Sequence, residues 1–390
     1  MHQLYLDLHY TSEIPGAYKK SADELSSDSG VNLGNFAFRH ALRFIVRDLF
    51  EYTPVRWADF NRAADQKPVD KVVVSCANWL GQSEHDERSN LVRAKTIERV
   101  DGPVISFGLG VQAQIKEDNS LPQLGPNTLR LAHALSERCV QLSVRDQLTQ
   151  DVLEADGIQN TVVTGCPSNF INATPNLGAL ISEKATNQLD SASSWKEVRS
   201  CISEASGGHG HSGAVMKFNA TLMAKTPAFY LVQSQALLPF LMGARTEIPQ
   251  SYRSNNPFMG KPGKLTQTLK AKTLHFSGLE PWMDFARTCD ISFGMRIHGT
   301  MVPLQAGVPS ILIAHDTRTV GLAERMGIPW ISPEEFIKVA QDSPKPLFDR
   351  ILTSMQKYDS HRKSLAQTMV EYLNANGLVP HQDIDSLSKS

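Results

Sequence analysis

Apolar side chains alternate between two spacings along most of the chain. From about residue 30, short runs rich in β-branched residues predict buried strands, and each run ends at a polar or glycine-containing turn. Segments with apolar residues three and four positions apart follow them and predict amphipathic helices. Strands are expected at 71–77, 103–108, 140–145, 161–163, 229–234, 273–277, 290–294 and 310–316. Repeated strand–helix alternation is typical of parallel sheets with crossover helices.

A polar interval at 187–213, which ends in a Gly-, His- and Ser-rich stretch, interrupts this alternation. With 390 residues the chain also exceeds the size at which one core usually stops growing. The sequence therefore predicts an α/β protein with two Rossmann-like domains, whose parallel sheets face a cleft. The expected parts are an N-terminal domain (1–186), a flexible linker or lid (187–213), a C-terminal domain (214–332) and C-terminal helices (333–390) that pack back on the N-terminal domain.

Charge and cysteine content narrow the class of protein. With 39 basic and 40 acidic side chains the formal net charge is -1, so nucleic acid is not expected as a partner. The five cysteines stand singly, which fits a reducing compartment. Neither a secretory leader nor a membrane-spanning run is found, and a cytoplasmic location is expected. His209 and His211 have a metal-ligand spacing, but no further ligand accompanies them, and a flexible loop is favoured over a metal site.

Ligands of open parallel sheets lie beyond the carboxyl ends of the strands, so the residues that follow each strand are the first candidates. The clearest candidate is the turn after strand 290–294, with Arg296 and His298 followed by Gly299 and Thr300 at the start of a helix. Free helix N–H groups, a guanidinium fork and an imidazole all suit an anion. The alternative interpretation is that Arg296 forms an ion pair with an acidic side chain and that His298 is a core residue. Position at a strand end favours the functional interpretation.

Three other turns add candidates. Asp316 and Arg318 follow the next strand, although Asp316 could cap a helix and Arg318 could lie in solvent. Arg145 ends another strand and could instead pair with Asp146 or Asp151. The small-residue loop with Asn32, Gly34 and Asn35 opens a helix and could bring backbone amides close to a ligand.

Two further motifs are weaker. The segment Gly108-Leu-Gly lacks the third glycine of a dinucleotide fingerprint, so NAD and FAD are not expected as cofactors. Residues 39–50 form a basic amphipathic pattern that could contact a membrane, but a helix that covers the sheet is favoured.

These residues together resemble the polysaccharide pyruvyl transferase family. The matching stretch reads Arg296-Ile-His-Gly-Thr, then Ala306-Gly-Val-Pro and a strand that ends in Asp316-Thr-Arg318, where lysine is common in the family. Ser143-Val-Arg-Asp and Val163-Thr-Gly-Cys-Pro match as well. The early N-x-G-D loop departs from the pattern, because Asn35 replaces the aspartate.

The resemblance implies a fold like that of GT-B glycosyltransferases, and transfer of pyruvate from phosphoenolpyruvate to a sugar as a ketal. The donor would be held by Arg296, His298, Gly299, Thr300 and Arg318 of the C-terminal domain, with Arg145 from the N-terminal domain. His298 would donate a proton or stabilise the leaving phosphate, as an imidazole near its ordinary pKa can, and Arg296 would hold the charge.

The N-terminal domain would bind the acceptor, with Asn32, Gly34 and Asn35 on that side and Asp316 or Glu280 as candidate bases. The acceptor could be free, lipid-linked or nucleotide-linked, and a lipid-linked acceptor would place the enzyme at the inner face of the membrane. Phosphoenolpyruvate is expected as co-substrate, with no metal or other cofactor. Two alternatives stay open: a glycosyltransferase that uses a nucleotide sugar, and a non-enzymatic protein that binds sugar phosphates.

Overall fold

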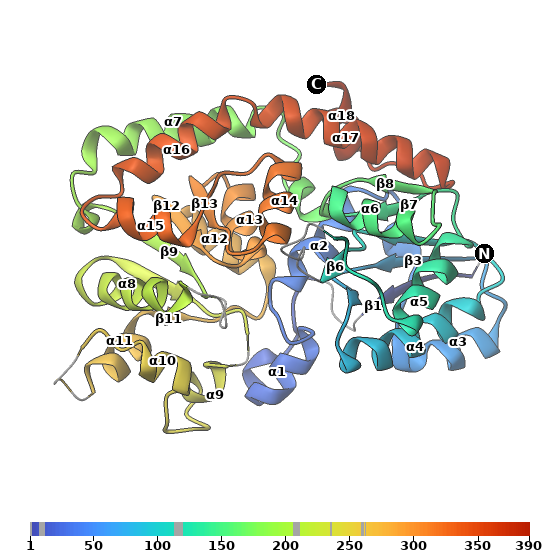
Figure 1. Ribbon diagram of the computed structural model, residues 1–390, viewed down its shortest axis with the longest axis horizontal. Helices are drawn as coiled ribbons and strands as arrows, with labels where there is room; N and C mark the ends of the chain where they lie inside the picture. The colour runs from blue at the N-terminus through green and yellow to red at the C-terminus, as the bar shows by residue number, and fades with distance from the viewer. Residues whose placement is uncertain are drawn as a thin grey trace.

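The computed structural model describes residues 2–7, 12–112, 120–205, 211–234, 236–258, 261 and 263–390. Two α/β halves lie side by side, and a group of helices runs along one edge of both (Figure 1). Each half is built around a parallel sheet. The predicted fold class, α/β with two Rossmann-like halves, is therefore confirmed.

The N-terminal sheet has the strand order β2-β1-β3-β5 with parallel pairing throughout. Its strands are β1 (Gln3–Asp7), β2 (Thr53–Arg56), β3 (Lys71–Ser75) and β5 (Val104–Phe107). The parallel pair β7 (Leu142–Val144) and β8 (Thr161–Val163) continues it through a single bridge between Leu109 and Val144. Two short strands, β4 (Leu80–Gly81) and β6 (Val111–Gln112), pair with each other. The surrounding helices are α3 (Phe60–Gln66), α4 (Glu84–Glu98), α5 (Pro126–Ser136) and α6 (Gln147–Ala155).

The C-terminal sheet has six parallel strands in the order β11-β10-β9-β12-β13-β14. They are β9 (Ser200–Ser203), β10 (Ala228–Leu231), β11 (Thr273–Leu274), β12 (Ile291–Gly294), β13 (Ser310–Ile313) and β14 (Trp330–Ile331). Counted along the chain this is the Rossmann order, in which the direction of strand addition reverses between the first and the fourth strand. Here those strands are β9 and β12, so the residues after them border the expected ligand crevice.

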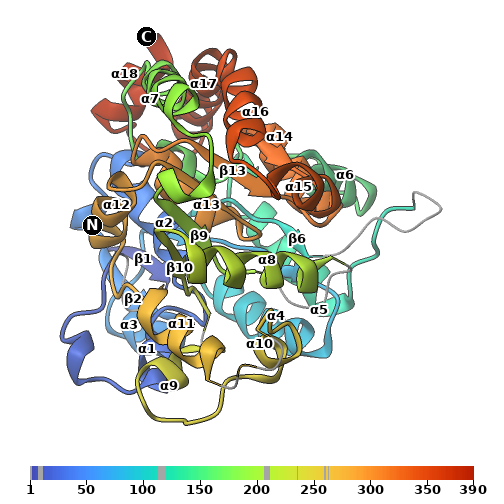
Figure 2. The same cartoon turned by 90° about the vertical axis from the view of Figure 1, so that its left-hand side faces the viewer.

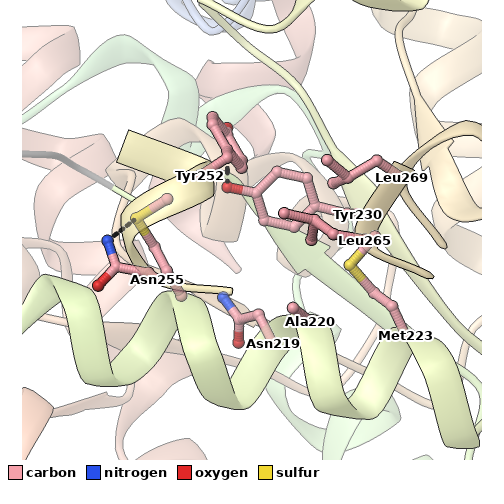
Figure 3. A pocket seen from close by; sticks show the side chains of 9 residues that line it. Asn219, Ala220, Met223, Tyr230, Tyr252, Asn255, Leu265 and Leu269 are labelled. Carbon is pink, nitrogen blue, oxygen red and sulfur yellow. Dashed lines mark hydrogen bonds between the residues drawn. The ribbon is translucent and has the colours of Figure 1, made fainter. Parts of the chain in front are cut away.

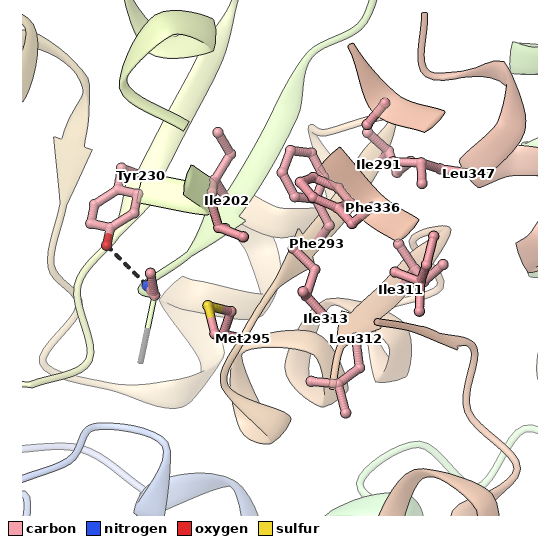
Figure 4. Packing of buried hydrophobic residues seen from close by; sticks show 14 of the residues in the cluster. Ile202, Tyr230, Ile291, Phe293, Met295, Ile311, Leu312, Ile313, Phe336 and Leu347 are labelled. Carbon is pink, nitrogen blue, oxygen red and sulfur yellow. Dashed lines mark hydrogen bonds between the residues drawn. The ribbon is translucent and has the colours of Figure 1, made fainter. Parts of the chain in front are cut away.

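Helices of the C-terminal half connect successive strands. Helices α8 (Ser212–Lys225) and α11 (Lys264–Lys272) contact each other and β10, while α12 (Leu279–Arg287) contacts α13 (Ile297–Gln305). Helix α14 (Thr317–Met326) leads from β13 towards β14. Figure 4 shows side chains of β9, β12 and β13 packed against Phe336 and Leu347 from later helices. The Phe293 and Phe336 rings lie 5.3 Å apart, and both are fully buried. This core fixes the positions of the strand ends.

The two halves share buried contacts. Helix α2 (Asn35–Ala41) and the short helix η5 (Pro167–Phe170) of the N-terminal half both contact α13. The Leu33 N–H donates to the Gln233 carbonyl over 2.8 Å. One cluster of buried apolar residues contains Phe36 from the first half and Leu231 and Val302 from the second. The base of the cleft is therefore a packed interface.

The C-terminal helices cross from one half to the other. In both views α7 (Leu177–Ser191), α16 (Lys345–Met355) and α17 (Tyr358–Ala375) lie along one edge of the molecule (Figures 1 and 2). Farther along, the Tyr372 ring lies 5.4 Å from that of Phe107, and Lys71 donates to the Gly377 carbonyl over 2.7 Å. The last helix is α18 (Gln382–Lys389), which contacts α17. The tail thus packs on the N-terminal half.

The prediction of a linker at 187–213 is wrong for the residues that the structure describes. Residues 200–203 form β9, which is fully buried and pairs with β10 and β12 at the centre of the sheet. The predicted boundaries at 186 and 213 fall inside α7 and α8. The serines of β9 are polar, yet they fit a central strand because their side chains are small. His209 lies outside the described residues, and His211 precedes α8.

The basic pattern at 39–50 is not one amphipathic helix. It contains the end of α2 and the single turns η2 (Leu42–Phe44) and η3 (Leu49–Glu51). Arg39 is buried and forms an ion pair with Asp7 over 3.0 Å, and His40 is buried too. A membrane-facing basic surface is therefore not formed by Arg39 and His40. In the described part of the chain, no helix combines the length and apolarity required to cross a membrane.

Candidate active site

A pocket of about 510 Å³ lies where the strand ends of the two halves meet. Its lining includes six of the predicted site residues, namely Asn32, Asn35, Arg145, Arg296, His298 and Arg318. Its charged side chains, among the residues described, are three arginines, and no aspartate or glutamate lines it. The pocket is therefore electropositive and open to a small anion.

Helix α13 directs its N-terminus at this pocket. It begins directly after β12, and Arg296 stands at the N-cap with no side chain capping the first turn. The first N–H groups of a helix have no partner within it, and together with the helix dipole they attract an anion. Gly299 is required here because a Cβ would lie 2.3 Å from the Ser203 Cβ. Thr300 is fully buried and does not line the pocket.

Arg296 and Arg318 each have one carboxylate partner behind the pocket. Arg296 Nε lies 3.3 Å from Glu204 Oε2, and Arg318 Nη2 lies 3.3 Å from Asp316 Oδ2. The side chains of both arginines are about one quarter exposed, at 26% and 24%, while those carboxylates are buried. Each ion pair leaves part of its guanidinium free for a ligand in the pocket.

Arg145 has no acidic partner among the contacts described. It donates to Asn78 Oδ1 over 3.0 Å and to the Cys76 carbonyl over 3.4 Å. The alternative ion pair with Asp146 is not formed, because Asp146 caps α6 through the Thr149 N–H at 2.8 Å. Arg145 is 3% exposed, so it is a buried cation in the pocket wall with its charge available to an anion.

The glycines of the Gly108-Leu-Gly segment lie beside Arg145. A Cβ at Gly110 would lie 3.2 Å from Arg145 Cδ, and one at Gly108 would lie 3.5 Å from Arg145 Nε. Gly108 also has a positive φ of 70°. Gly110 therefore makes room for Arg145, whereas Gly108 is required by its backbone conformation.

His298 is 5% exposed, and its Nε2 lies 3.4 Å from Cys166 Sγ. Its ring centroid lies 5.6 Å from that of Phe38, which also faces the Arg145 guanidinium at 5.4 Å. Burial, followed by the nearby Arg145 and Arg39 charges, lowers the pKa of His298 to about 3. The expectation of an ordinary pKa is wrong for the unliganded protein, in which the imidazole is neutral at neutral pH.

Comparison with known proteins identifies the family. A family model described as polysaccharide pyruvyl transferase matches residues 32–317. The chain belongs to the polysaccharide pyruvyl transferase family. The matched range begins at the Asn32 loop, includes β12 and α13, and ends one residue before Arg318.

Solved structures give only distant likenesses to this transferase. The Methanocaldococcus jannaschii UDP-GlcNAc 2-epimerase, solved with UDP-GlcNAc and UDP, has a TM-score of 0.37 and 13% identity over 83% of this chain and 81% of that chain. The Neisseria meningitidis UDP-GlcNAc 2-epimerase has a TM-score of 0.41 and 11% identity over 100% of both chains. WaaG, a glycosyltransferase of lipopolysaccharide biosynthesis, has a TM-score of 0.38 and 11% identity over 100% of both. None of the curated proteins compared matches the chain.

The Asn32–Asn35 loop of the transferase lies against the C-terminal half. Asn32 Oδ1 accepts from the Gly34 N–H over 3.0 Å, and Asn35 donates to the Gly30 carbonyl over 3.0 Å. A Cβ at Gly34 would lie 2.9 Å from the His298 Cβ. The small-residue loop therefore allows the two halves to approach closely beside His298.

The two candidate bases differ in position. Glu280 is exposed in the first turn of α12 and does not line the pocket, so the structure does not bring it to the other residues. Asp316 caps α14 by accepting from the Thr319 N–H over 2.6 Å. Burial would raise the pKa of Asp316, but Arg318 and the Thr319 hydrogen bonds outweigh it and lower that pKa. Asp316 is thus a weak base whose oxygens are already engaged.

Several polar side chains at the site, including Glu204, Gln233 and Cys166, were missed from the sequence. Glu204 follows β9, accepts from Ser234 and Tyr252, and forms the ion pair with Arg296. Gln233 follows β10 and lines the pocket, and Cys166 contacts His298. Position after a strand could have indicated Glu204 and Gln233, but β9 was hidden in the predicted linker.

A second cavity lies in the C-terminal half, beside Tyr230 and Tyr252 (Figure 3). It measures about 20 Å³ and is lined mainly by apolar side chains with Tyr230, Tyr252 and Asn219. This volume suits about one water molecule, so the cavity cannot hold a sugar. Among the described residues, no group of three or more histidine, cysteine or acidic side chains is arranged to hold a metal ion.

Proposed function

We propose that this transferase moves the pyruvyl group of phosphoenolpyruvate onto two hydroxyls of a sugar, as a ketal. The observation that carries the proposal is the convergence of Arg145, Arg296 and Arg318 with His298 on one pocket beside the free end of α13. Phosphoenolpyruvate carries a carboxylate and a phosphate on a three-carbon frame. Several cationic donors within a few ångströms suit such a compact polyanion.

The reaction requires a proton on the methylene carbon of the donor and a hydroxyl oxygen on the neighbouring carbon. The proton goes to the terminal carbon as the first hydroxyl attacks, and the C–O bond to phosphate then breaks with phosphate as leaving group. The second hydroxyl attacks the same carbon and closes the ketal. The two hydroxyls give up two protons in all: one replaces the proton delivered to the methylene carbon, and the other leaves with the phosphate. Positive charge beside the departing phosphate stabilises this step.

His298 is suited to the proton transfer only after the donor binds. In the free protein its pKa is about 3, because of burial and the charges of Arg145 and Arg39. A bound polyanion would offset both arginine charges and raise that pKa towards neutral. The imidazole would then carry a proton in the complex, beside the reacting carbon.

The proposal is tested by incubation of the protein with phosphoenolpyruvate and free, lipid-linked and nucleotide-linked glycans. Mass spectrometry should show an acceptor that gains one pyruvate less one water, together with release of phosphate. A parallel thermal-shift series should show stabilisation by phosphoenolpyruvate. Stabilisation by nucleotide sugars alone, with no mass gain on any glycan, would favour the glycosyltransferase alternative, since the α13 N-terminus also suits a pyrophosphate.

A further inference from the structure

Gln233 has a buried carboxamide for which no partner is found among the described residues. The residue is 3% exposed and lines the pocket, yet neither Nε2 nor Oε1 has a hydrogen-bond partner in the described part of the chain. Buried polar groups without partners are rare in folded proteins because each loses its hydrogen bonds to water. An amide retained in this state at a pocket wall indicates a ligand that supplies the missing partners.

The backbone holds Gln233 firmly on both sides. Its N–H donates to Glu204 Oε2 over 3.1 Å, and its carbonyl accepts from the Leu33 N–H over 2.8 Å. The side chain therefore starts from a fixed point between the two halves. The Gln233 side chain can move mainly by rotation about its own bonds.

The carboxamide lies between two glycines. A Cβ at Gly299 would lie 2.4 Å from Nε2, and a Cβ at Gly34 would lie 2.9 Å from Oε1. Gly299 belongs to the first turn of α13, so the amide lies at the same helix end as the anion site. Ser203 Oγ, which also has no partner within the described ranges, would lie 2.6 Å from the same Gly299 Cβ. Unpartnered polar atoms thus gather around the first turn of α13.

We infer that Gln233 is a further binding residue for the anionic donor. Its NH2 group donates to the anion held at the α13 N-terminus, and rotation of the carboxamide about its last bond can present either end. Its oxygen remains free to accept from a hydroxyl on the side of the Asn32–Asn35 loop. The inference rests on the proposed function for the identity of the anion, but not for the existence of the anion site.

Gln305 provides a matched control. It is also a glutamine, fully buried in α13, but its side chain accepts from the Asn172 N–H and donates to Tyr358 Oη, both over 3.0 Å. Substitution of a partnered amide by methionine leaves buried groups unsatisfied. The same substitution at an amide without a partner breaks no hydrogen bond.

The test compares Gln233→Met, Gln233→Glu and Gln305→Met with the unmodified chain. We expect Gln233→Met to keep or raise the Tm, while Gln305→Met lowers it. Gln233→Met should weaken binding of phosphoenolpyruvate at least tenfold, and Gln233→Glu should weaken it further because it adds a negative charge. Binding is measured by calorimetry with phosphoenolpyruvate and, separately, with inorganic phosphate.

Unchanged affinity of Gln233→Met for both anions would overturn the inference, as would a Tm loss equal to that of Gln305→Met. If the unmodified chain binds phosphate but not phosphoenolpyruvate, the proposed donor is wrong, and Gln233 is then judged by its effect on phosphate affinity. If the unmodified chain binds neither anion, both proposals fail.

Discussion

At the scale of single residues, the positively charged side chains of the site differ in how their charges are neutralised. Arg296 and Arg318 have buried carboxylates behind them, whereas Arg145 is held by an amide and a carbonyl oxygen. His298 lies between apolar surroundings and positive charge, and its pKa falls to about 3 as a result. An incoming anion therefore changes the protonation of His298 more than that of any arginine.

Binding of phosphoenolpyruvate should consequently take up protons through His298. We expect calorimetry at pH 7, in buffers of different ionisation enthalpy, to show greater proton uptake for the unmodified chain than for His298→Asn. Phosphoenolpyruvate contributes equally to both measurements, so the difference reports on His298. Turnover of His298→Asn should fall by about 10² to 10⁴. Equal proton uptake by the two proteins would contradict the assigned role.

Glu204 organises the buried polar contacts behind Arg296. It accepts from the Gln233 and Ser234 N–H groups and from Tyr252 Oη. Glu204→Ala leaves these donors without a partner, and we expect it to lower the free energy of unfolding by about 3–5 kcal/mol. Urea unfolding measures the change. As a control, the exposed Glu280→Ala should change it by less than about 0.5 kcal/mol; a similar loss in both variants would show that Glu204 has no special role.

At the scale of elements, the site depends on how closely α13 approaches β9. Small residues on both sides, Gly299 on the helix and Ser203 on the strand, permit this approach. Strand β9 has the sequence Ser200-Cys-Ile-Ser, which is too polar and short to read as a buried strand. Its register beside β12 places Glu204 behind Arg296.

Gly299→Ala should therefore disrupt the site. The new Cβ would lie 2.3 Å from the Ser203 Cβ, and relief of that overlap requires α13 to move away from β9. We expect a loss of about 1–3 kcal/mol in unfolding free energy and weaker binding of phosphoenolpyruvate. Gly321→Ala in α14 is the control, since no atom lies within 4 Å of its new Cβ and alanine favours a helix by about 0.5–1 kcal/mol. Thermal unfolding should move the two variants in opposite directions.

The loop before α2 contains a strained residue at the pocket. Val31 has a positive φ of 67°, which is unfavourable for a β-branched side chain, and it lines the pocket. Val31→Gly should relieve strain and raise the free energy of unfolding by up to about 1 kcal/mol. Strain of this kind often accompanies function, so we expect turnover to fall in the same variant. A stability loss in urea unfolding would contradict the strain.

At the scale of the whole molecule, two halves with separate sheets share one interface and one pocket. Histidines at this interface and elsewhere in the molecule are neutral in the folded protein. Burial is the main cause that lowers the pKa of His40 and His275 to about 4 and that of His298 to about 3. In the unfolded chain these groups titrate near 6.5.

Stability should fall as the pH drops below about 6.5, because the unfolded chain then binds protons that the folded chain does not. The stabilising contribution is complete above the unfolded pKa and is lost towards the folded values near 4. Urea unfolding at pH 7 and pH 5 should show a loss of up to about 2 kcal/mol for each of the three histidines. His275→Gln should reduce the slope; an unchanged slope would mean that His275 is protonated when folded.

The sequence by itself determined most of the strand–helix alternation of both halves and predicted that the β12–α13 turn binds an anion. Arg296, His298 and Gly299 are neighbours in the chain, so local spacing suffices to recognise them. Position after a strand also indicated Arg145 and the Asp316-Thr-Arg318 turn, and the resemblance to the family supported both. The pocket contains both arginines.

Only the tertiary structure decided which charges are paired, which imidazole is neutral and which amide has no partner among the residues described. Glu204 forms an ion pair with Arg296, which is 92 positions later in the chain. Cys166 contacts His298, which is 132 positions later in the chain. The pKa of His298 depends on Arg145 and Arg39, from two other segments. Burial and Coulomb interactions act through space, so their magnitude is set by which distant strand ends the two sheets bring together.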